Sequence, residues 1–492
     1  MSDAHILLLA IAVPALTPVL IAGLSNRPNL RDGASVIASL ATFAAVITLL
    51  CKVMDGARPA ISLLEMMPGL VIAFEIEPLG MLFATVASGL WIPTALYSIG
   101  YMRGAGEQKQ TRFYICFAIA IAAALGIAFS ANLFTLFIFY EALTISTYPL
   151  VAHKETPEAK RGARTYLAIL MATSIVFLLV AIIWTWNIAG TTDFRAGGIL
   201  QGRIDPVYVP FLLALFAFGI GKAALMPFHR WLPAAMVAPT PVSALLHAVA
   251  VVKAGVFTML KVGTYIFGVG FLGKTGASDW LMWLAAASIL IASIVALTKD
   301  DLKARLAYST VSQLSYITLG MALATQMGVV GGAMHIATHA MGKIALFMCA
   351  GAIYVAAHKT KVSELDGLGR RMPVTFICFT IAALSIIGLP PFGGAWSKWY
   401  LMIAAADTNH LIIIGVLMLS SLLNVAYLLP IPARAFFAPS KQGDEDAIRK
   451  EAPLFCLLPI CFAALGCIAL FFIVGGFYEY LLSIPILPES LP

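Results

Sequence analysis

The chain has 492 residues, of which 61% are hydrophobic and 11% are charged, and its formal net charge is +7. Together with a mean hydropathy of +0.94, this composition excludes an ordinary water-soluble globular protein. The positive charge does not indicate a nucleic-acid-binding protein, because the basic residues are spread over many short loops and form no stripe.

The apolar segments are long enough to cross a membrane as helices. They repeatedly reach the roughly 20 residues that span a bilayer core, and alternating strand patterns are absent. The first segment, Ile6–Ala22, lacks the basic flank and cleavage site of a signal peptide, so we expect a retained span. The sequence predicts an all-α polytopic membrane protein with about fourteen transmembrane helices, near residues 4–24, 34–54, 79–101, 112–129, 131–152, 162–187, 208–240, 241–268, 280–297, 304–323, 327–356, 374–404, 409–435 and 454–477.

Lysine and arginine are distributed unevenly between the loops. Loops after odd-numbered spans carry most of them, whereas loops after even-numbered spans hold Lys52, Arg58, Arg195, Arg203 and Lys274. Because basic loops stay in the cytoplasm, this asymmetry predicts that both termini lie on the non-cytoplasmic side. The longest polar connection, Ala438–Glu451, is then a cytoplasmic loop, and no soluble domain is expected.

Spans seven (208–240) and twelve (374–404) are interrupted by proline and glycine. Pro227 and Pro233 follow Gly221-Lys222 in the first, and Pro390-Pro391 precede Lys398 in the second. Proline frees a backbone carbonyl, which lipid does not tolerate unless the site lines a wet cavity or packs in protein. Paired broken helices are typical of transporters built from inverted repeats. We therefore expect two inverted five-helix repeats at 112–268 and 280–435, preceded by a three-helix segment at 1–111 and followed by a loop and last helix at 436–492.

Five charged residues lie inside apolar segments, where each costs about 2.5–3.5 kcal/mol of insertion free energy. They are Glu141, Lys222, Lys253, Lys343 and Lys398. A buried ion pair or a lysine that reaches the interface explains one such residue, whereas five together indicate an ion path. At 1.5 Å per residue, Glu141 lies about 15 Å deep and Lys222 and Lys253 about 18 Å, which predicts three charges at one level. Glu141 would then control whether Lys222 holds a proton.

Two histidines precede Lys343 at helical spacing. His335, His339 and Lys343 are each four residues apart and share one helical face. The spacing resembles a metal-binding pair, but no carboxylate is near in sequence and the third group is a cation. A haem is also disfavoured, because two histidines one turn apart on one helix cannot clamp one iron. We predict a proton wire with no metal or cofactor, and His247 is a further candidate member.

Five sequence blocks resemble one known family. They are Phe139–Thr144, Gly221–Leu232, Ala238–His247, Lys299–Gln313 and Gly388–Gly394. They are similar to the proton-pumping antiporter-like subunits shared by respiratory complex I and Mrp-type cation/proton antiporters, over roughly spans four to thirteen. Within that family, the length and the lysine at 398 look most like the D subunit of Mrp antiporters, since one complex I relative has glutamate there.

The resemblance implies a proton-translocating subunit that is not itself an enzyme and has no redox centre. Its Glu on span five and Lys on spans seven, eight and twelve correspond to Glu141, Lys222, Lys253 and Lys398. Protons would cross a hydrated axis from Glu141 through Lys222, Lys253, His339 and Lys343 to Lys398. The expected partners are other membrane subunits, H⁺ and Na⁺ in a bacterial cytoplasmic membrane, and no nucleic acid.

Other assignments stay open. The same channel suits a membrane-arm subunit of complex I or of a membrane-bound hydrogenase, driven by redox chemistry elsewhere. A scaffold subunit that had lost transport would carry neutral residues at several axis positions, and none of the six is neutral. An autonomous secondary transporter would need a substrate site beyond the charged axis.

Overall fold

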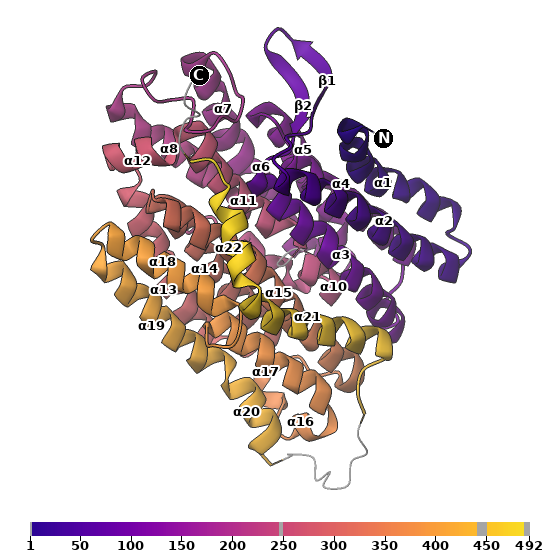
Figure 1. The fold of residues 1–492 in the computed structure, drawn as a ribbon. Coiled ribbons are helices and arrows are strands. Elements are labelled where there is room, and N and C mark those ends of the chain that lie inside the picture. Colours follow the sequence, from indigo (N-terminus) through magenta and orange to yellow (C-terminus); the bar gives the residue numbers. More distant parts are fainter. Residues whose placement is uncertain (1, 246–248, 440–449, 487–492) are drawn as a thin grey trace.

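Helices make up almost all of the regular structure, and a short β-hairpin projects from one end (Figure 1). The computed structural model describes residues 2–245, 249–439 and 450–486. Its first half contains α1 (Asp3–Gly23), α2 (Pro28–Met54), β1 (Ala60–Met67), β2 (Leu70–Glu75), α3 (Pro78–Gly104), α4 (Gln110–Ala128), α5 (Leu133–Val151), α6 (Pro157–Thr173), α7 (Leu179–Ala189), α8 (Val209–Gly219), α9 (Trp231–Ala234), α10 (Thr240–Ala244), α11 (Val251–Val262) and α12 (Val269–Thr275).

The second half continues with helices only. It contains α13 (Asp279–Thr298), α14 (Leu302–Ala322), α15 (Gln326–Ala357), α16 (Leu368–Arg371), α17 (Pro373–Ile387), α18 (Gly394–Asp407), α19 (Leu411–Leu428), α20 (Pro430–Phe437), α21 (Leu454–Phe472) and α22 (Val474–Leu482). Short π-helical turns at Ser174–Leu178 and Gly263–Phe267 extend α6 and α11, and 3₁₀ turns lie at Pro206–Tyr208, Gly221–Ala223, Ala235–Val237 and Val362–Glu364.

Ten helical segments in the described part of the chain are long and apolar enough to cross a bilayer, and the bent pair Val251–Phe267 and Val269–Thr275 makes an eleventh. Large apolar side chains such as Val19, Ile37 and Leu422 are exposed on their outer faces, where lipid tails replace water. The chain is thus a multi-pass membrane protein. The count of about fourteen spans stays a prediction, because broken helices such as α8 and α17 are shorter than a full crossing.

The β-hairpin corrects the expectation that the chain has no strands. Strands β1 and β2 are antiparallel and join at Pro68-Gly69, where Gly69 has φ +82° as a type II turn requires. The register shifts between Ser62 and Leu64 and again between Glu65 and Met67. These irregularities break the two-residue alternation of apolar and polar side chains, so the pattern is invisible in the sequence.

The interruptions in spans seven and twelve separate α8 from α9 and α17 from α18. Side chains bond the carbonyls that each break frees. Trp231 Nε1 donates to Gly221 O at 2.9 Å, and Lys398 Nζ donates to Ile387 O at 2.7 Å. Backbone groups that lipid could not satisfy therefore have partners inside the protein.

The span predicted at 241–268 is not one continuous helix. Helix α10 ends at Ala244 and α11 begins at Val251, so Lys253 lies in the first turn of α11 instead of deep within a long helix. Pro239 and Pro241 start α10, and a chain restricted by two prolines begins a short helix readily. The depth of about 18 Å that we counted for Lys253 along a continuous helix does not hold for this broken path.

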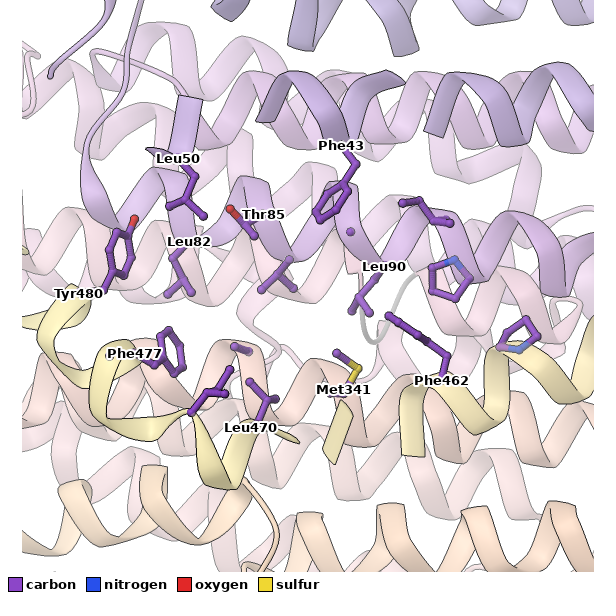
Figure 2. Close-up of a pocket in the computed structure, with 18 of the residues that line it drawn as sticks. Phe43, Leu50, Leu82, Thr85, Leu90, Met341, Phe462, Leu470, Phe477 and Tyr480 are labelled. Atoms are coloured by element: carbon purple, nitrogen blue, oxygen red, sulfur yellow. The ribbon is translucent and has the colours of Figure 1, made fainter. Parts of the chain in front are cut away.

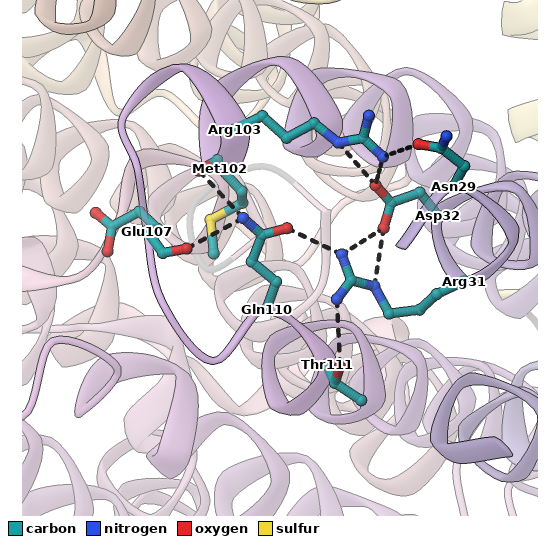
Figure 3. A network of polar contacts seen from close by, with 8 residues as sticks. All are labelled: Asn29, Arg31, Asp32, Met102, Arg103, Glu107, Gln110 and Thr111. Carbon is teal, nitrogen blue, oxygen red and sulfur yellow. Dashed lines mark hydrogen bonds and ion pairs between the residues drawn. The ribbon is translucent and has the colours of Figure 1, made fainter. Parts of the chain in front are cut away.

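A buried ionic network joins α2 to α3 and α4 (Figure 3). Asp32 accepts hydrogen bonds from Arg31 Nη2 at 2.8 Å and from Arg103 Nη2 at 2.5 Å, and Arg31 also donates to Gln110 and Thr111. Because Asp32 is 2% exposed and pairs with two guanidinium groups, its charge is compensated. The network holds the start of α2 against the end of α3 and the start of α4.

An apolar cavity of about 850 Å³ separates α2 and α3 from α21 and α22 (Figure 2). Phe43, Leu82, Leu470 and Phe477 point into it. Among the described residues that line it, none is acidic or basic. It therefore lies apart from the charged residues that the sequence singled out.

Candidate functional site

Helix α15 carries three of the candidate residues into the centre of the bundle. It packs against α14, α17, α18 and α21, and His335, His339 and Lys343 are each 2% exposed or less. The rings of His335 and His339 stack with centroids 5.7 Å apart, as residues one turn apart on a helix can. Two imidazoles thus lie in direct contact along one face.

The amine of Lys253 reaches this stack from α11. Lys253 Nζ is hydrogen-bonded to His339 Nδ1, and Lys253 is completely buried. Two cations repel each other at contact distance in a low-dielectric interior, so the contact is favourable when one of the two groups is neutral. Lys253 and His339 can therefore share one proton.

The other end of the stack leads to the interrupted helix pair α17 and α18. His335 Nδ1 is hydrogen-bonded to Ser397 Oγ at 2.8 Å, and the His335 ring stacks on Tyr316 with centroids 5.3 Å apart. Lys398 follows Ser397 in sequence, and its Nζ lies 5.1 Å from the centroid of the same Tyr316 ring. The Tyr316 ring thus contacts both His335 and Lys398.

Lys398 is held by groups on both sides of the break. Its Nζ donates to Ile387 O at 2.7 Å and to Ser421 Oγ of α19 at 3.0 Å. Gly388 has φ +90°, and a Cβ there would lie 2.8 Å from the Lys398 Cδ, so glycine lets the lysine pass close to the backbone. Lys398 also lines a cavity of about 490 Å³ between α18 and α19.

Lys343 turns away from the histidines toward α14. Its Nζ donates to Ser309 Oγ at 2.7 Å and to Leu306 O at 3.2 Å. Ser309 in turn accepts a hydrogen bond from Tyr427 of α19 at 2.8 Å. Lys343 is thus buried beside the stack, and its hydrogen bonds lead to Leu306 and Ser309 of α14. Its expected place between His339 and Lys398 stays a prediction.

Lys222 lies in the 3₁₀ turn after α8 and contacts α5. Its Nζ donates to Tyr140 O at 2.8 Å and to Thr144 Oγ1 at 2.6 Å, and it lies 3.2 Å from the centroid of the Tyr140 ring. These partners flank Glu141 in sequence. Within the described residues, however, no ion pair joins Lys222 to Glu141, and both Glu141 oxygens are buried without a hydrogen-bond partner.

The 3₁₀ turn that contains Lys222 packs closely against α11 through backbone atoms. A Cβ on Gly255 would overlap the Lys222 carbonyl carbon, so only glycine permits this approach. Gly255 lies two residues after Lys253. The packing therefore brings the Lys222 turn and the Lys253 segment together without a side-chain contact between the two lysines.

Several buried polar groups near these residues lack a protein partner within the described part of the chain. They include both amide atoms of Gln313, Nε2 of His335 and the carboxylate of Glu141. Gln313 lies on α14 between Ser309, the partner of Lys343, and Tyr316, the partner of His335. Buried polar groups in this arrangement normally bond to internal water. The centre of the molecule is therefore suited to hold water.

A small polar cavity of about 150 Å³ opens near the basic loops. Lys154, Asp301 and Lys303 line it together with Thr240, which begins α10. Nearby Glu107 has its pKa raised from its ordinary value, first by burial, whereas Lys154 and Lys303 lower it. This cavity therefore places charged side chains beside the start of α10.

The structure brings most of the predicted residues together. His335, His339, Lys253 and Lys398 form one buried group, with Lys343 beside it and Lys222 and Glu141 on the far side of Gly255. His247 lies outside the described residues. The sequence analysis missed Lys261, which is completely buried eight residues after Lys253, although a second lysine in one apolar span was a visible signal.

This arrangement can move protons. Amines and imidazoles hold or release a proton at fixed positions, and hydroxyl groups and water carry it between them. Lys253 and His339 are joined by a hydrogen bond, and so are His335 and Ser397, whereas the two histidine rings contact each other by stacking. Water would have to carry the proton between Lys222 and Lys253 and past the stacked rings.

The known proteins to which this chain is similar are membrane subunits of quinone oxidoreductases and of cation/proton antiporters. Residues 130–424 match the family model described as NADH:quinone oxidoreductase/Mrp antiporter, TM. The chain is 31% identical to NADH-quinone oxidoreductase subunit N of Desulforudis audaxviator, covering 86% of each chain. It is 30% identical to a probable K(+)/H(+) antiporter protein of Rhizobium meliloti, covering 87% of this chain but 44% of that protein.

Two solved structures share the fold. A chain in the structure of the Mrp complex from Dietzia sp. superposes with a TM-score of 0.86 at 23% identity, covering 99% of this chain and 97% of that one. A chain of the membrane-bound sulfane sulfur reductase, an archaeal respiratory membrane complex, gives a TM-score of 0.87 at 25% identity, covering 98% and 97%.

Proposed function

Because the chain belongs to the NADH:quinone oxidoreductase/Mrp antiporter transmembrane family, we propose that it is a proton-translocating membrane subunit of a multi-subunit Mrp-type Na⁺/H⁺ antiporter. The observation that carries this proposal is the buried contact series from Lys253 through His339 and His335 to Ser397, beside Lys398. Burying these titratable groups in apolar helices has a cost that proton transport explains. The chain would itself catalyse no chemical reaction.

In the proposed path, a proton passes between Lys222, the Lys253–His339 pair, His335 and Lys398. The hydrogen bond of His335 to Ser397 supports His335 as the link to Lys398, with Lys343 as a side branch on Ser309. Lys222 donates hydrogen bonds to Tyr140 and Thr144, which lie on the same helix as Glu141. In the proposed path, Glu141 acts on Lys222 from this neighbouring position. A shift of α5 that brings the carboxylate to the amine would favour protonated Lys222.

The proposal includes an architecture and an orientation. We infer fourteen membrane crossings, with two inverted five-helix repeats at 112–268 and 280–435, in a bacterial cytoplasmic membrane. The breaks at Lys222 and Lys398, each with a freed carbonyl bonded by a side chain, support equivalent roles in the two repeats. From the basic loops we infer that the hairpin end of the molecule lies on the non-cytoplasmic side.

The partners follow from the relatives, which are subunits of antiporters and respiratory complexes. A membrane-arm subunit of a complex I-like NADH:quinone oxidoreductase or of a membrane-bound hydrogenase is the second candidate. Its specific support is the 31% identity to a subunit N over 86% of both chains. In that case, redox chemistry in another subunit would drive the same path.

Purification of the native complex tests both candidates. Its subunits are identified by mass spectrometry, and proton movement is followed in proteoliposomes with a pH-sensitive dye. The antiporter assignment expects apolar antiporter subunits and proton flux when a Na⁺ gradient is imposed. If the complex instead contains iron–sulfur subunits and moves protons only during quinone or ferredoxin turnover, the antiporter assignment is wrong and the second candidate is correct. An assembled complex without proton flux under either drive would reject both.

A further inference from the structure

Lys261 is a buried lysine that the proposed path does not use. It lies in the last turn of α11 and is completely buried. Its Nζ donates to Ser130 O at 3.0 Å, forms an ion pair with Glu77 Oε1 at 3.1 Å, and lies 4.6 Å from the centroid of the Phe194 ring. A second buried amine thus lies on the helix that carries Lys253.

Glu77 meets Lys261 from the start of α3. Its carboxylate accepts the backbone N–H groups of Leu79 and Gly80, each at 2.7 Å, and the hydroxyl of Tyr265 at 2.7 Å. Its side chain is 12% exposed, whereas that of Lys261 is 1% exposed. Glu77 is therefore the member of the pair that is closer to water.

Four chain segments enclose the pair at the hairpin end. Backbone hydrogen bonds join β2 to the connection between α4 and α5, and they join that connection to residues 192–194. A further backbone hydrogen bond joins Arg195 to Tyr265, which follows α11. The enclosure is thus built from residues far apart in sequence. It holds Lys261 and Glu77 in fixed positions at the level where α11 approaches the surface.

Acidic groups lie around the pair on its outer side. Glu75 interacts electrostatically with Lys261 and Glu77 of the pair, and also with Asp193 and Arg58. The pKa of Glu75 is raised, first by burial, then by Glu77 and Asp193, while Lys261 and Arg58 lower it. Tyr480 of α22 bonds to Pro78 O beside the site. Carboxylates at a surface can collect and release protons.

We propose that Lys261 and Glu77 form a further proton-exchange pair, through which protons of the path reach the aqueous phase at the hairpin end. This inference rests on the proposed function. The ammonium of Lys261 transfers its proton to Glu77 Oε1, which leaves a neutral amine and a carboxylic acid. Glu77 then gives the proton to water near Glu75 and Asp193, and the amine takes a proton from water on the Lys253 side. For proton uptake, the same steps run in reverse.

A structural role alone does not account for both residues. Any short acceptor side chain can cap α3, so the cap does not require a lysine nearby. A buried ion pair is rarely more stable than apolar side chains of the same volume. Lys253 lies eight residues before Lys261, about 12 Å along the helix. A short water chain can cover that distance.

Conservative variants separate proton exchange from structure, measured as Na⁺-driven proton flux of the reconstituted complex. Lys261→Arg keeps the charge and its partners but cannot lose a proton. Glu77→Asp can exchange a proton, whereas Glu77→Gln cannot. We expect Lys261→Arg and Glu77→Gln to lower the flux on the order of 10²-fold, and Glu77→Asp to keep most of it. Exposed Lys274→Arg at the same end is the matched control.

Wild-type flux in an assembled Lys261→Arg complex would overturn the proposal. If that variant fails to assemble, wild-type flux in Glu77→Gln overturns it instead. A second readout does not depend on transport, namely the infrared difference spectrum of wild type minus Glu77→Gln during a pH titration. We expect a carboxylic-acid band of Glu77 that grows as the pH falls. A Glu77 that stays ionised throughout would refute the exchange, even if the antiporter assignment itself failed.

Discussion

Lys253 Nζ and His339 Nδ1 are hydrogen-bonded to each other between α11 and α15. The bond joins an amine to an imidazole, so it differs from an ordinary salt bridge between an amine and a carboxylate. An amine and an imidazole in contact avoid repulsion by holding one proton between them. The contact therefore connects two helices by a group that can change its protonation without losing its partner.

Replacement of His339 tests this relationship. His339→Phe keeps an aromatic ring that can stack on His335 but removes both ring nitrogens. We expect proton flux in proteoliposomes to fall on the order of 10²-fold, because Lys253 loses the group with which it shares a proton. The exposed His5→Phe is the control. Unchanged flux in an assembled His339→Phe complex would remove His339 from the path.

Glu141→Ala and Lys222→Ala should each abolish ion-coupled transport while the complex still assembles. Lys222 is held by Tyr140 O and Thr144 Oγ1, and its loss leaves these acceptors without the amine. Glu141 has no hydrogen bond within the described residues, so its removal breaks no packing contact of that kind. Size-exclusion profiles report assembly, and Lys52→Ala and Glu158→Ala serve as surface controls. Normal flux in either variant would contradict the proposed switch.

Lys398→Glu should reduce transport only in part. An ionised carboxylate can accept a hydrogen bond from the Ser421 hydroxyl, but it cannot donate to Ile387 O unless it is protonated or bridged by water. We therefore expect slower flux that recovers as the pH falls, because protonation restores a donor. The dependence of the rate on pH in vesicles measures this. A variant whose flux is equally low at every pH would show that the charge itself is required.

A surface cluster on the basic-loop side gives a prediction of pH-dependent stability. Lys109 and Arg112 donate to Glu155 at 2.6 and 2.7 Å and lower its pKa to about 2 from an ordinary value of 4.5. Because the folded-state pKa is depressed, the stabilisation is present above pH 4.5 and is lost as the pH falls toward 2.

Thermal unfolding of wild type and Glu155→Gln in detergent, compared across this range, measures the loss. We expect wild type to be more stable at about pH 7, by a margin that salt reduces because the cluster is exposed. The margin should shrink as the solution is acidified below pH 4.5. A constant difference at all pH values would mean that the ion pairs contribute nothing to folding stability.

The sequence by itself determined the class of the protein and most of the candidate residues. Apolar segments of sufficient length require membrane helices, and charges such as Glu141 and Lys398 are conspicuous inside them because lipid penalises each one. The two breaks were also predictable, since proline and glycine interrupt helices through local backbone constraints. These features depend on residues close together in the chain.

Only the tertiary structure decided which groups meet. The Lys253–His339 bond, the contact of Lys261 with Glu77, and the turn of Lys343 toward Ser309 join residues from different helices. The broken path between α10 and α11 also changed the position of Lys253 from the depth counted along a continuous helix. Helix packing sets such distances, and it depends on close approaches, such as that at Gly255, which no local pattern encodes.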